Sequence, residues 1–384
     1  MATVDTKPAM SVFSVDVAQT YQAPPPKSKS GLGKKRFSFQ LLPIIKIKRR
    51  SKRTQSMSEM SNIQEDCGLE SDKVMLTDDF TSSSEDEQES GQVNCSFDAE
   101  VNSNAKLYKA FGRRLMAGGN LKDGADIQHL EQGKCVVADL LNCRLVIFSK
   151  SGKSSVILQN KDIVEPWGLA IHEDLILVTS RRKKCIVKIS QTGNKEEMSF
   201  GESCFQDPCG IGVTKDHRII VSDIQSKTVS VHEWSGKRLF DLRPPNNKTF
   251  QLPRYVTVSP TGDIIISDSG NHCIYLYSEN GAFKKTFGSF GSNDGQLKTP
   301  YGVCCDPFGN IFVADHYNDR VSFYTKDGDF IKHVLTKEDG IFHPQGISFS
   351  ADMKIFVTHG SLKACEVKVF SLLDTSGTIP IFHV

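Results

Sequence analysis

Cationic and aromatic side chains recur together in the later part of this chain. One group is the basic run Arg181, Arg182, Lys183 and Lys184, and the others are Trp167, Arg254, His272, Tyr301, His316 and Tyr317. Lys and Arg pair with phosphates while aromatic rings stack on bases, which is the combination that single-stranded nucleic acid requires. The same residue types also suit a solvated loop and the lining of a channel, because adjacent charges are common on protein surfaces.

The spacing of nucleophiles and bases gives no catalytic pattern. No Ser-His-Asp or Cys-His pairing can be argued from it, and the ten His are scattered. Eleven Cys include no C-x-x-C pair, so a thiolate zinc site is not expected. The first residues lack the regions of a secretory signal, and the thiols are therefore expected to be reduced and buried. We predict no catalytic residue, no metal site and no cofactor.

The elements that must position the cationic and aromatic residues repeat along the chain. An apolar run ends on Asp and resumes after a polar patch in "KCVVADLLNCRL", "RIIVSDIQSKTV", "DIIISDSGNHCI" and "NIFVADHYNDRV". A proline stands fourteen or fifteen residues earlier in most units, at Pro166, Pro208, Pro253, Pro300 and Pro344. With the Asp position as the register mark, the units fall at Asp139, Ser180, Asp223, Asp268, Asp315 and His359.

Steps of 41 to 47 residues between these marks, with four short strands in each unit, are typical of β-propeller blades. In the fifth unit the strands are "GVCCD", "NIFVAD", "RVSFYT" and "DFIKHVL". The sequence therefore predicts an all-β fold, a six-bladed β-propeller over residues 106–384. The repeated Asp and Asn are interpreted as turn residues, since their side chains bind backbone N–H groups and Asn tolerates a left-handed backbone.

Two segments compete for the outer strand that closes the ring. "KLYKAFG" at 106–112 resembles the outer strand "AFKKTFG" at 282–288, and "TIPIFHV" at 378–384 is equally apolar. The sequence leaves both possibilities open.

The chain before the propeller has the composition of a disordered tail. Residues 1–105 are rich in Ser, Pro, Lys and Glu and hold only short apolar stretches. The tail is basic over 27–53, with eleven Lys or Arg, and acidic over 59–100, with thirteen acids and one Lys. Kinases that prefer basic or acidic surroundings would act on Ser51, Thr54, Ser82, Ser83 and Ser84. We expect a cytoplasmic protein without a membrane span, in which residues 46–53 are a candidate nuclear-import signal.

Units four and five resemble NHL repeats. The resemblance rests on "LPRYVTVSPTGDIIISDSGNHCIYLYSENG" and "PYGVCCDPFGNIFVADHYNDRVSFYTKDG", and is closest to the propellers of tripartite-motif NHL proteins. It implies a propeller that binds RNA or that works in ubiquitin ligation. Members of that family carry RING and B-box zinc domains and a coiled coil before the propeller. Residues 1–105 hold only Cys67 and Cys95 and no His, so ligase activity is not expected from this chain alone.

Propellers usually bind ligands on the face where the links leading into the innermost strands meet the links between second and third strands. We call this the upper face and the opposite one the lower face. The residue after each leading proline should encircle the upper mouth of the channel, which gives Ala125, Trp167, Cys209, Arg254, Tyr301 and Gln345. The second-to-third links should add the basic run 181–184 together with His272, His316 and Tyr317.

Three functions follow as alternatives. A basic upper face with rings among the charges predicts single-stranded RNA binding. The 34 Lys or Arg against 30 Asp or Glu in residues 106–384 favour instead a platform for protein partners, such as RING ubiquitin ligases or their clients. The third alternative is a six-bladed enzyme of the lyase or lactonase type with a metal in its channel, for which the predicted ring offers few metal ligands. We predict a non-enzymatic binding platform.

Overall fold

The structure is a computed structural model that describes residues 105–113, 120–192 and 196–372. The predicted tail lies outside these ranges except for Ala105. The candidate phosphorylation sites Ser51, Thr54, Ser82, Ser83 and Ser84 lie outside the described residues as well.

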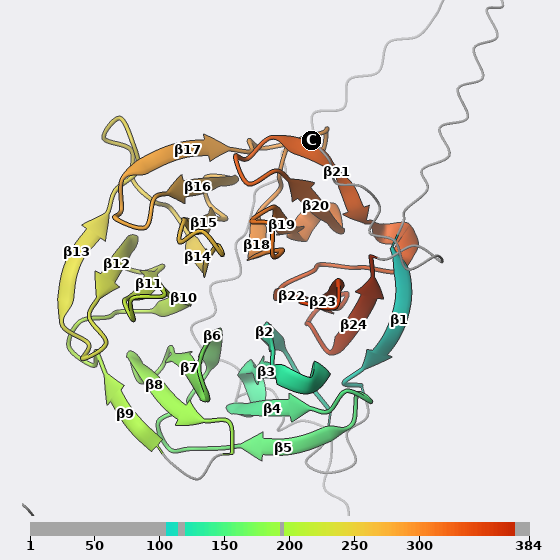
Figure 1. The fold of residues 1–384 in the computed structure, drawn as a ribbon, viewed down its shortest axis with the longest axis horizontal. Helices are drawn as coiled ribbons and strands as arrows, with labels where there is room; N and C mark the ends of the chain where they lie inside the picture. The colour runs from blue at the N-terminus through green and yellow to red at the C-terminus, as the bar shows by residue number, and fades with distance from the viewer. Residues whose placement is uncertain (1–104, 114–119, 193–195, 373–384) are drawn as a thin grey trace, which may run out of the picture. The chain divides into compact units, whose positions relative to one another are not determined.

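Six four-stranded antiparallel sheets form a ring, so the predicted six-bladed β-propeller is confirmed (Figure 1). Blade 1 holds β2 (Gly124–His129), β3 (Cys135–Asp139), β4 (Arg144–Phe148) and β5 (Ser154–Leu158). Blade 2 holds β6 (Pro166–His172), β7 (Leu175–Ser180), β8 (Cys185–Ser190) and β9 (Glu196–Phe200). Blade 3 holds β10 (Pro208–Val213), β11 (Ile219–Asp223), β12 (Thr228–His232) and β13 (Arg238–Leu242).

The other three blades follow the same order from the centre outward. Blade 4 holds β14 (Pro253–Val258), β15 (Ile264–Asp268), β16 (Cys273–Tyr277) and β17 (Phe283–Phe287). Blade 5 holds β18 (Pro300–Cys305), β19 (Ile311–Asp315), β20 (Arg320–Tyr324) and β21 (Phe330–Leu335). Blade 6 holds β22 (Ile347–Ser350), β23 (Lys354–His359), β24 (Glu366–Ser371) and β1 (Lys106–Phe111).

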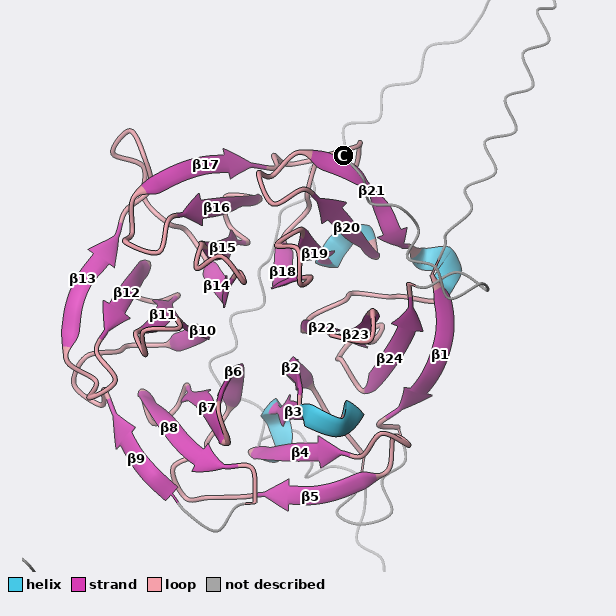
Figure 2. Cartoon of the chain, in the orientation of Figure 1, coloured by secondary structure: helices cyan, strands magenta, loops and turns pink. Residues whose placement is uncertain are grey.

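Within the described ranges, four short 3-10 helices lie in the links between strands (Figure 2). They are η1 (Glu131–Gly133), η2 (Leu140–Asn142), η3 (His316–Asn318) and η4 (Lys337–Asp339). Both η2 and η3 occupy second-to-third links on the upper face, whereas η1 joins an innermost strand to the second strand and so lies on the lower face.

The N-terminal strand closes the ring. Strand β1 pairs antiparallel with β24, with Lys106 opposite Ser371 and Phe111 opposite Val367. Of the two segments that the sequence left open, 106–112 therefore supplies the outer strand of blade 6, and 378–384 lies outside the described residues. The last blade is thus built from both parts of the chain.

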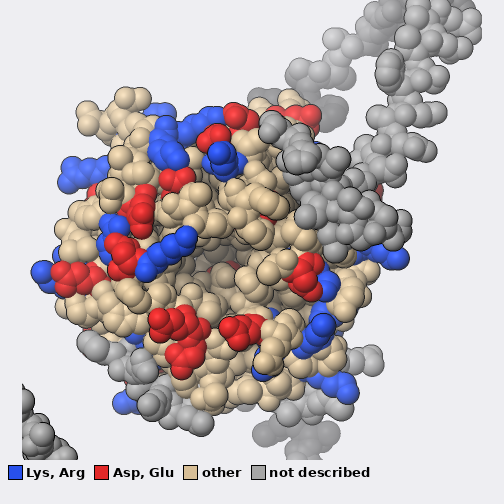
Figure 3. All heavy atoms as spheres, in the orientation of Figure 1, with Lys and Arg blue, Asp and Glu red and all other residues tan. Residues whose placement is uncertain are grey.

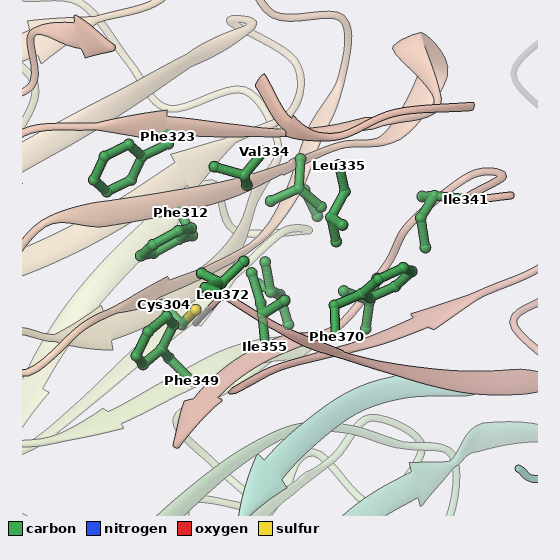
Figure 4. Packing of buried hydrophobic residues seen from close by; sticks show 14 of the residues in the cluster. Cys304, Phe312, Phe323, Val334, Leu335, Ile341, Phe349, Ile355, Phe370 and Leu372 are labelled. Carbon is green, nitrogen blue, oxygen red and sulfur yellow. The ribbon is translucent and has the colours of Figure 1, made fainter. Parts of the chain in front are cut away.

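Apolar side chains pack between neighbouring blades and hold the ring together. The cluster in Figure 4 joins blade 5, through Cys304, Phe312 and Phe323, to blade 6, through Phe349 and Phe370. Phe312 and Phe349 stack with ring centroids 5.1 Å apart. Burying a side chain of this size contributes about 1.5–3 kcal/mol, so such clusters are the main source of cohesion between sheets.

The repeated Asp residues stabilise the links, as predicted from the sequence. Asp139 is fully buried and accepts a hydrogen bond from the backbone N–H of Lys122, at 3.0 Å, in the link leading into its blade. Asn142 donates its side-chain amide to the same carboxylate at 2.8 Å. In blade 2, Ser180 takes over this role and both accepts from and donates to the backbone of Val164 at 3.0 Å. These side chains fix the links of the upper face.

Candidate binding site on the upper face

Strand pairing places the predicted site residues at one end of the ring. Pro166, which begins β6, lies opposite Ser180 at the end of β7, so Trp167 and the basic run 181–184 share the upper face. In blade 5, Pro300 pairs with Asp315 in the same way, which puts Tyr301 beside His316 and Tyr317. The predicted residues are therefore brought to one face, although their role as ligand contacts stays a prediction.

Four of the six residues predicted at the channel mouth pack into one apolar cluster. Trp167 and Cys209 are buried, and they belong with Ala125, Tyr255 and Tyr301 to a cluster that crosses the axis. Tyr255 lies 6.3 Å from Trp167 and 6.2 Å from Tyr301 between ring centroids. Its hydroxyl donates a hydrogen bond to the carbonyl oxygen of Ala125 on the opposite side of the ring. Side chains thus fill the upper end of the channel.

Tyr255 was not among the predicted site residues, although the repeat carries a signal for it. The second residue after the leading proline is Gly in four blades, at Gly168, Gly210, Gly302 and Gly346. A Cβ at Gly302 would lie 2.4 Å from the carbonyl oxygen of Gln345, because neighbouring innermost strands approach closely there. The equivalent residues in blades 4 and 1 are Tyr255 and Asp126, and both are buried. The departures from Gly mark the side chains that enter the channel.

Trp167 lies between two guanidinium groups that differ in their partners. The Arg181 guanidinium carbon is 4.9 Å from the Trp167 ring, and that of Arg254 is 5.8 Å from it. Arg181 donates from Nε and Nη2 to both carboxylate oxygens of Asp207, each at 2.6 Å. Arg254 also lies over Tyr301, with its guanidinium carbon 4.8 Å from the ring, and forms no ion pair with the described residues. Cation–π contacts hold Arg254 in place.

The rest of the basic run is divided between paired and free charges. Arg182 is exposed and pairs with Glu165 at 2.8 Å between Nε and Oε1. Lys183 and Lys184 are exposed, and neither forms an ion pair with any residue that the structure describes. Two of the four basic side chains are therefore paired with acids in the lead-in links of blades 2 and 3, and the two lysines carry the remaining charge.

Histidines line the blade 5 side of the site and are uncharged. His316 is buried and stacks on Tyr301, with ring centroids 4.1 Å apart, while its Nδ1 donates to the carbonyl oxygen of Pro344. Burial lowers the pKa of His316 to about 4. Burial also lowers the pKa of His272, whose Nδ1 accepts the backbone N–H of Thr299. At neutral pH both rings act as aromatic surfaces rather than as cations.

Exposed apolar side chains form an arc on the same face. Leu362 is 96% exposed, Phe290 63% and Tyr317 51%. Hydrogen bonds hold the links that carry these side chains. The backbone N–H of Tyr317 donates to the carbonyl of Lys298, and the backbone N–H of Gly360 donates to that of Phe342. The Nδ1 of His343 donates to the carbonyl of Ser361. We call Phe290, Tyr317, Phe342 and Leu362 the apolar arc. It runs over blades 5 and 6, on the side away from the basic run of blade 2.

The lower end of the channel is hollow. A cavity of about 810 Å³ is lined by His129 and Val213, at the ends of innermost strands, and by Glu131, Glu173 and Asp352 in the links after them. Figure 3 looks onto this lower face, toward which η1 projects in Figure 2, and shows acidic and basic side chains around a central hollow.

The described part of the chain gives no metal-binding group of three or more His, Cys, Asp or Glu. All nine described cysteines are free, and burial raises the pKa of Cys135, Cys209 and Cys273 to about 12. Such thiols stay protonated at neutral pH and are poor nucleophiles. Among the helices that the structure describes, none is long and apolar enough to cross a membrane.

Comparison with known proteins supports the repeat type. Residues 250–274, in blade 4, match the NHL repeat family, so the predicted NHL repeat is confirmed there. The protein Brain tumor of Drosophila melanogaster is 29% identical over 97 residues, which are 24% of this chain and 9% of that protein. The match thus spans less than a tenth of that relative's length.

Solved structures share the fold at low identity. A structural genomics protein of unknown function from Bacteroides thetaiotaomicron has a TM-score of 0.55 at 10% identity, over 70% of this chain and 73% of that one. Virginiamycin B lyase from Staphylococcus aureus has a TM-score of 0.51 at 13% identity, over 70% of this chain and 100% of that one. At such identity the likeness concerns the fold alone.

Proposed function

We propose that this chain is a non-enzymatic NHL β-propeller whose upper face binds a segment of a protein partner. The observation that carries the proposal is the apolar arc. Its side chains are exposed by 36% to 96% and lie beside a channel mouth that aromatic rings close. Several large apolar side chains exposed on one face are characteristic of protein interaction sites, because monomeric proteins rarely expose such groups together.

The resemblance to tripartite-motif NHL proteins suggests which partners to look for. A platform of this kind would hold either a RING ubiquitin ligase or one of its clients. The alternative of a metal enzyme has little support, because the described residues offer no cluster of metal ligands and the upper end of the channel is filled.

Substitution of the apolar arc tests the proposal. In the full chain, Phe290→Ser, Tyr317→Ser, Phe342→Ser and Leu362→Ser together remove the arc. The control, Leu239→Ser with Phe240→Ser, removes exposed apolar side chains from the outer strand β13. Crosslinking and mass spectrometry after ribonuclease treatment should find partners on the parent and on the control but not on the arc variant. Equal recovery of partners with all three proteins would refute the proposal.

A second candidate is single-stranded RNA binding, favoured by Lys183 and Lys184, which are exposed and form no ion pair with the residues that the structure describes. Affinity for a 20-nucleotide oligouridine should fall steeply between 50 and 200 mM salt, since each phosphate contact releases counterions. Lys183→Gln with Lys184→Gln should reduce both the affinity and the salt slope. The charge-matched control, Lys153→Gln with Lys326→Gln in third-to-fourth links of blades 1 and 5, should change neither. Equal binding by the two variants would rule out this site.

A further inference from the structure

Two hydrogen-bond donors at the centre of the upper face have no acceptor. The indole Nε1 of Trp167 and the Nε of Arg254 are both covered from solvent, and no hydrogen-bond partner for either lies among the described residues. Nearly all buried donors in folded proteins are paired, since leaving one unpaired costs free energy. Here two occur in side chains that contact each other, and one of the two belongs to a cation. An acceptor that carries negative charge is the group that would satisfy both.

Arg181 shows which acceptor suits this geometry. Arg181 is the other arginine whose guanidinium contacts the Trp167 ring. Its Nε and Nη2 donate to the two carboxylate oxygens of Asp207. Planar carboxylates match the guanidinium fork, and such charge-assisted pairs are the stronger hydrogen bonds in proteins. Arg254 presents the same fork without an Asp or Glu. Its side chain is only partly buried and no carboxylate of the described residues fixes it, so its guanidinium can turn within the ring contacts toward a group that arrives from the upper face.

We propose that Arg254 and Trp167 form a receptor for a single carboxylate, an Asp or Glu side chain of the bound protein segment. The inference rests on the proposed function and adds the chemical class of residue that the segment must carry. A carboxylate fits better than a phosphate, because a dianion needs more positive charge than one unpaired guanidinium among aromatic rings. The apolar arc would then bind the apolar residues beside that acid.

Selection from a peptide library tests the receptor and needs no identified partner. The probe is a library of random 16-residue linear peptides displayed on phage, selected against the full chain. Enriched peptides should share an Asp or Glu at one fixed position next to apolar residues. Arg254→Gln should weaken the binding of a synthetic selected peptide by about 10- to 100-fold, as expected for loss of a partly desolvated charge pair. Lys227→Gln, an exposed charge on the same face, should change it less than about twofold.

A double-mutant cycle assigns the contact. Replacing the acid of the peptide by Gln should cost as much as Arg254→Gln, and combining both changes should cost little more than either one, because each removes the same pair. Trp167→Phe, which keeps a ring but removes the N–H, should weaken binding to a smaller extent. Thermal unfolding of each variant shows whether it is folded.

The remaining outcomes separate the inference from the proposed function. Peptides that bind the arc without a fixed acid, or that bind Arg254→Gln as well as the parent, would overturn the carboxylate receptor and leave the platform standing. Tighter binding of a phosphoserine peptide than of its Glu counterpart would also overturn it, in favour of a phosphate. No enrichment at all would reject the platform and the receptor together.

Discussion

Tyr255 of blade 4 donates its hydroxyl to the backbone carbonyl of Ala125 in blade 1, across the axis of the propeller. The two residues are 130 positions apart in the chain, and both are buried in the cluster that fills the upper channel. A bond between opposite blades fixes the diameter of the ring at this level.

Removal of that hydroxyl should therefore weaken the whole ring. Tyr255→Phe should lower the free energy of unfolding by about 1–3 kcal/mol, because the buried Ala125 carbonyl loses its donor. Urea unfolding followed by tryptophan fluorescence measures this. Tyr317→Phe, which removes a hydroxyl from an exposed ring, is the control and should cost less than about 0.5 kcal/mol. The prediction fails if the two variants have the same free energy of unfolding.

Replacing a glycine where innermost strands approach closely should destabilise the fold more than replacing a glycine elsewhere. In Gly302→Ala the new Cβ would lie 2.4 Å from the Gln345 oxygen and 2.9 Å from the Ile347 nitrogen. These backbone atoms cannot move away without shifting a blade, so we expect the free energy of unfolding to fall by about 2 kcal/mol or more. In Gly212→Ala the nearest atoms to the new Cβ are methyl groups of Val258, at 3.3 Å, and Val256, at 3.4 Å, so the free energy of unfolding should fall by about 1 kcal/mol or less. A comparison of urea midpoints decides between them.

Much of this architecture could be predicted from the sequence, and the limits have physical causes. Six blades could be predicted because in four of them an Asp fixes the lead-in link through hydrogen bonds to its backbone, so the Asp recurs in the sequence at the period of the blades. The closing strand could not be predicted. Residues 106–112 and 378–384 are both apolar enough to form an outer strand, so composition does not show which of them pairs with β24.

The face on which the candidate residues lie could be predicted from the sequence, but their contacts could not, and their role in binding stays a prediction. Trp167, Tyr301 and the run 181–184 were correctly placed on one face, because strand direction alone determines the end at which each link lies. The capture of Arg181 by Asp207 depends on a contact between neighbouring blades, which no local pattern encodes. The burial of Trp167 and His316 follows from the same kind of contact, through Tyr255 and Tyr301.

Closure by β1 gives a third prediction. Deleting residues 1–112 should lower stability by at least about 2 kcal/mol, since the burial of Phe111 against Phe148, with ring centroids 4.7 Å apart, is lost along with the β1–β24 pairing. Truncation after Leu372 should leave the unfolding midpoint unchanged, because the outer place in blade 6 is already taken. A larger loss on truncation than on deletion would show that the closing strand has been misassigned.

Acid should destabilise the propeller through its buried histidines. Burial lowers the pKa of His316, His333 and His359 to about 4, so between pH 6.5 and 4 the unfolded chain binds protons that the folded one does not. Stability is therefore full above about pH 6.5 and falls as the pH is lowered. Asp126 opposes this trend, since burial raises its pKa to about 7 and favours the folded state at lower pH.

The three histidines outweigh this one carboxyl, and from pH 7 to pH 5 we expect a net loss on the order of 3 kcal/mol in the free energy of unfolding. Urea unfolding at a series of pH values measures it. His316→Phe keeps the stack on Tyr301 but cannot titrate, so its pH dependence should be smaller than that of the parent by on the order of 1–2 kcal/mol. Parallel curves for the two proteins would contradict the assignment to His316.

The pairing of Lys106 with Ser371 means that the propeller cannot close until its synthesis on the ribosome is nearly finished. At about 5–20 residues per second, the earliest strand emerges roughly 13 to 53 seconds before the strand it must join. During that interval five sheets can assemble while the first strand waits with its hydrogen-bonding edge unpaired. A chaperone that covers such edges would be most useful in that window, and a ribosome that stalls late would release an open arc instead of a ring.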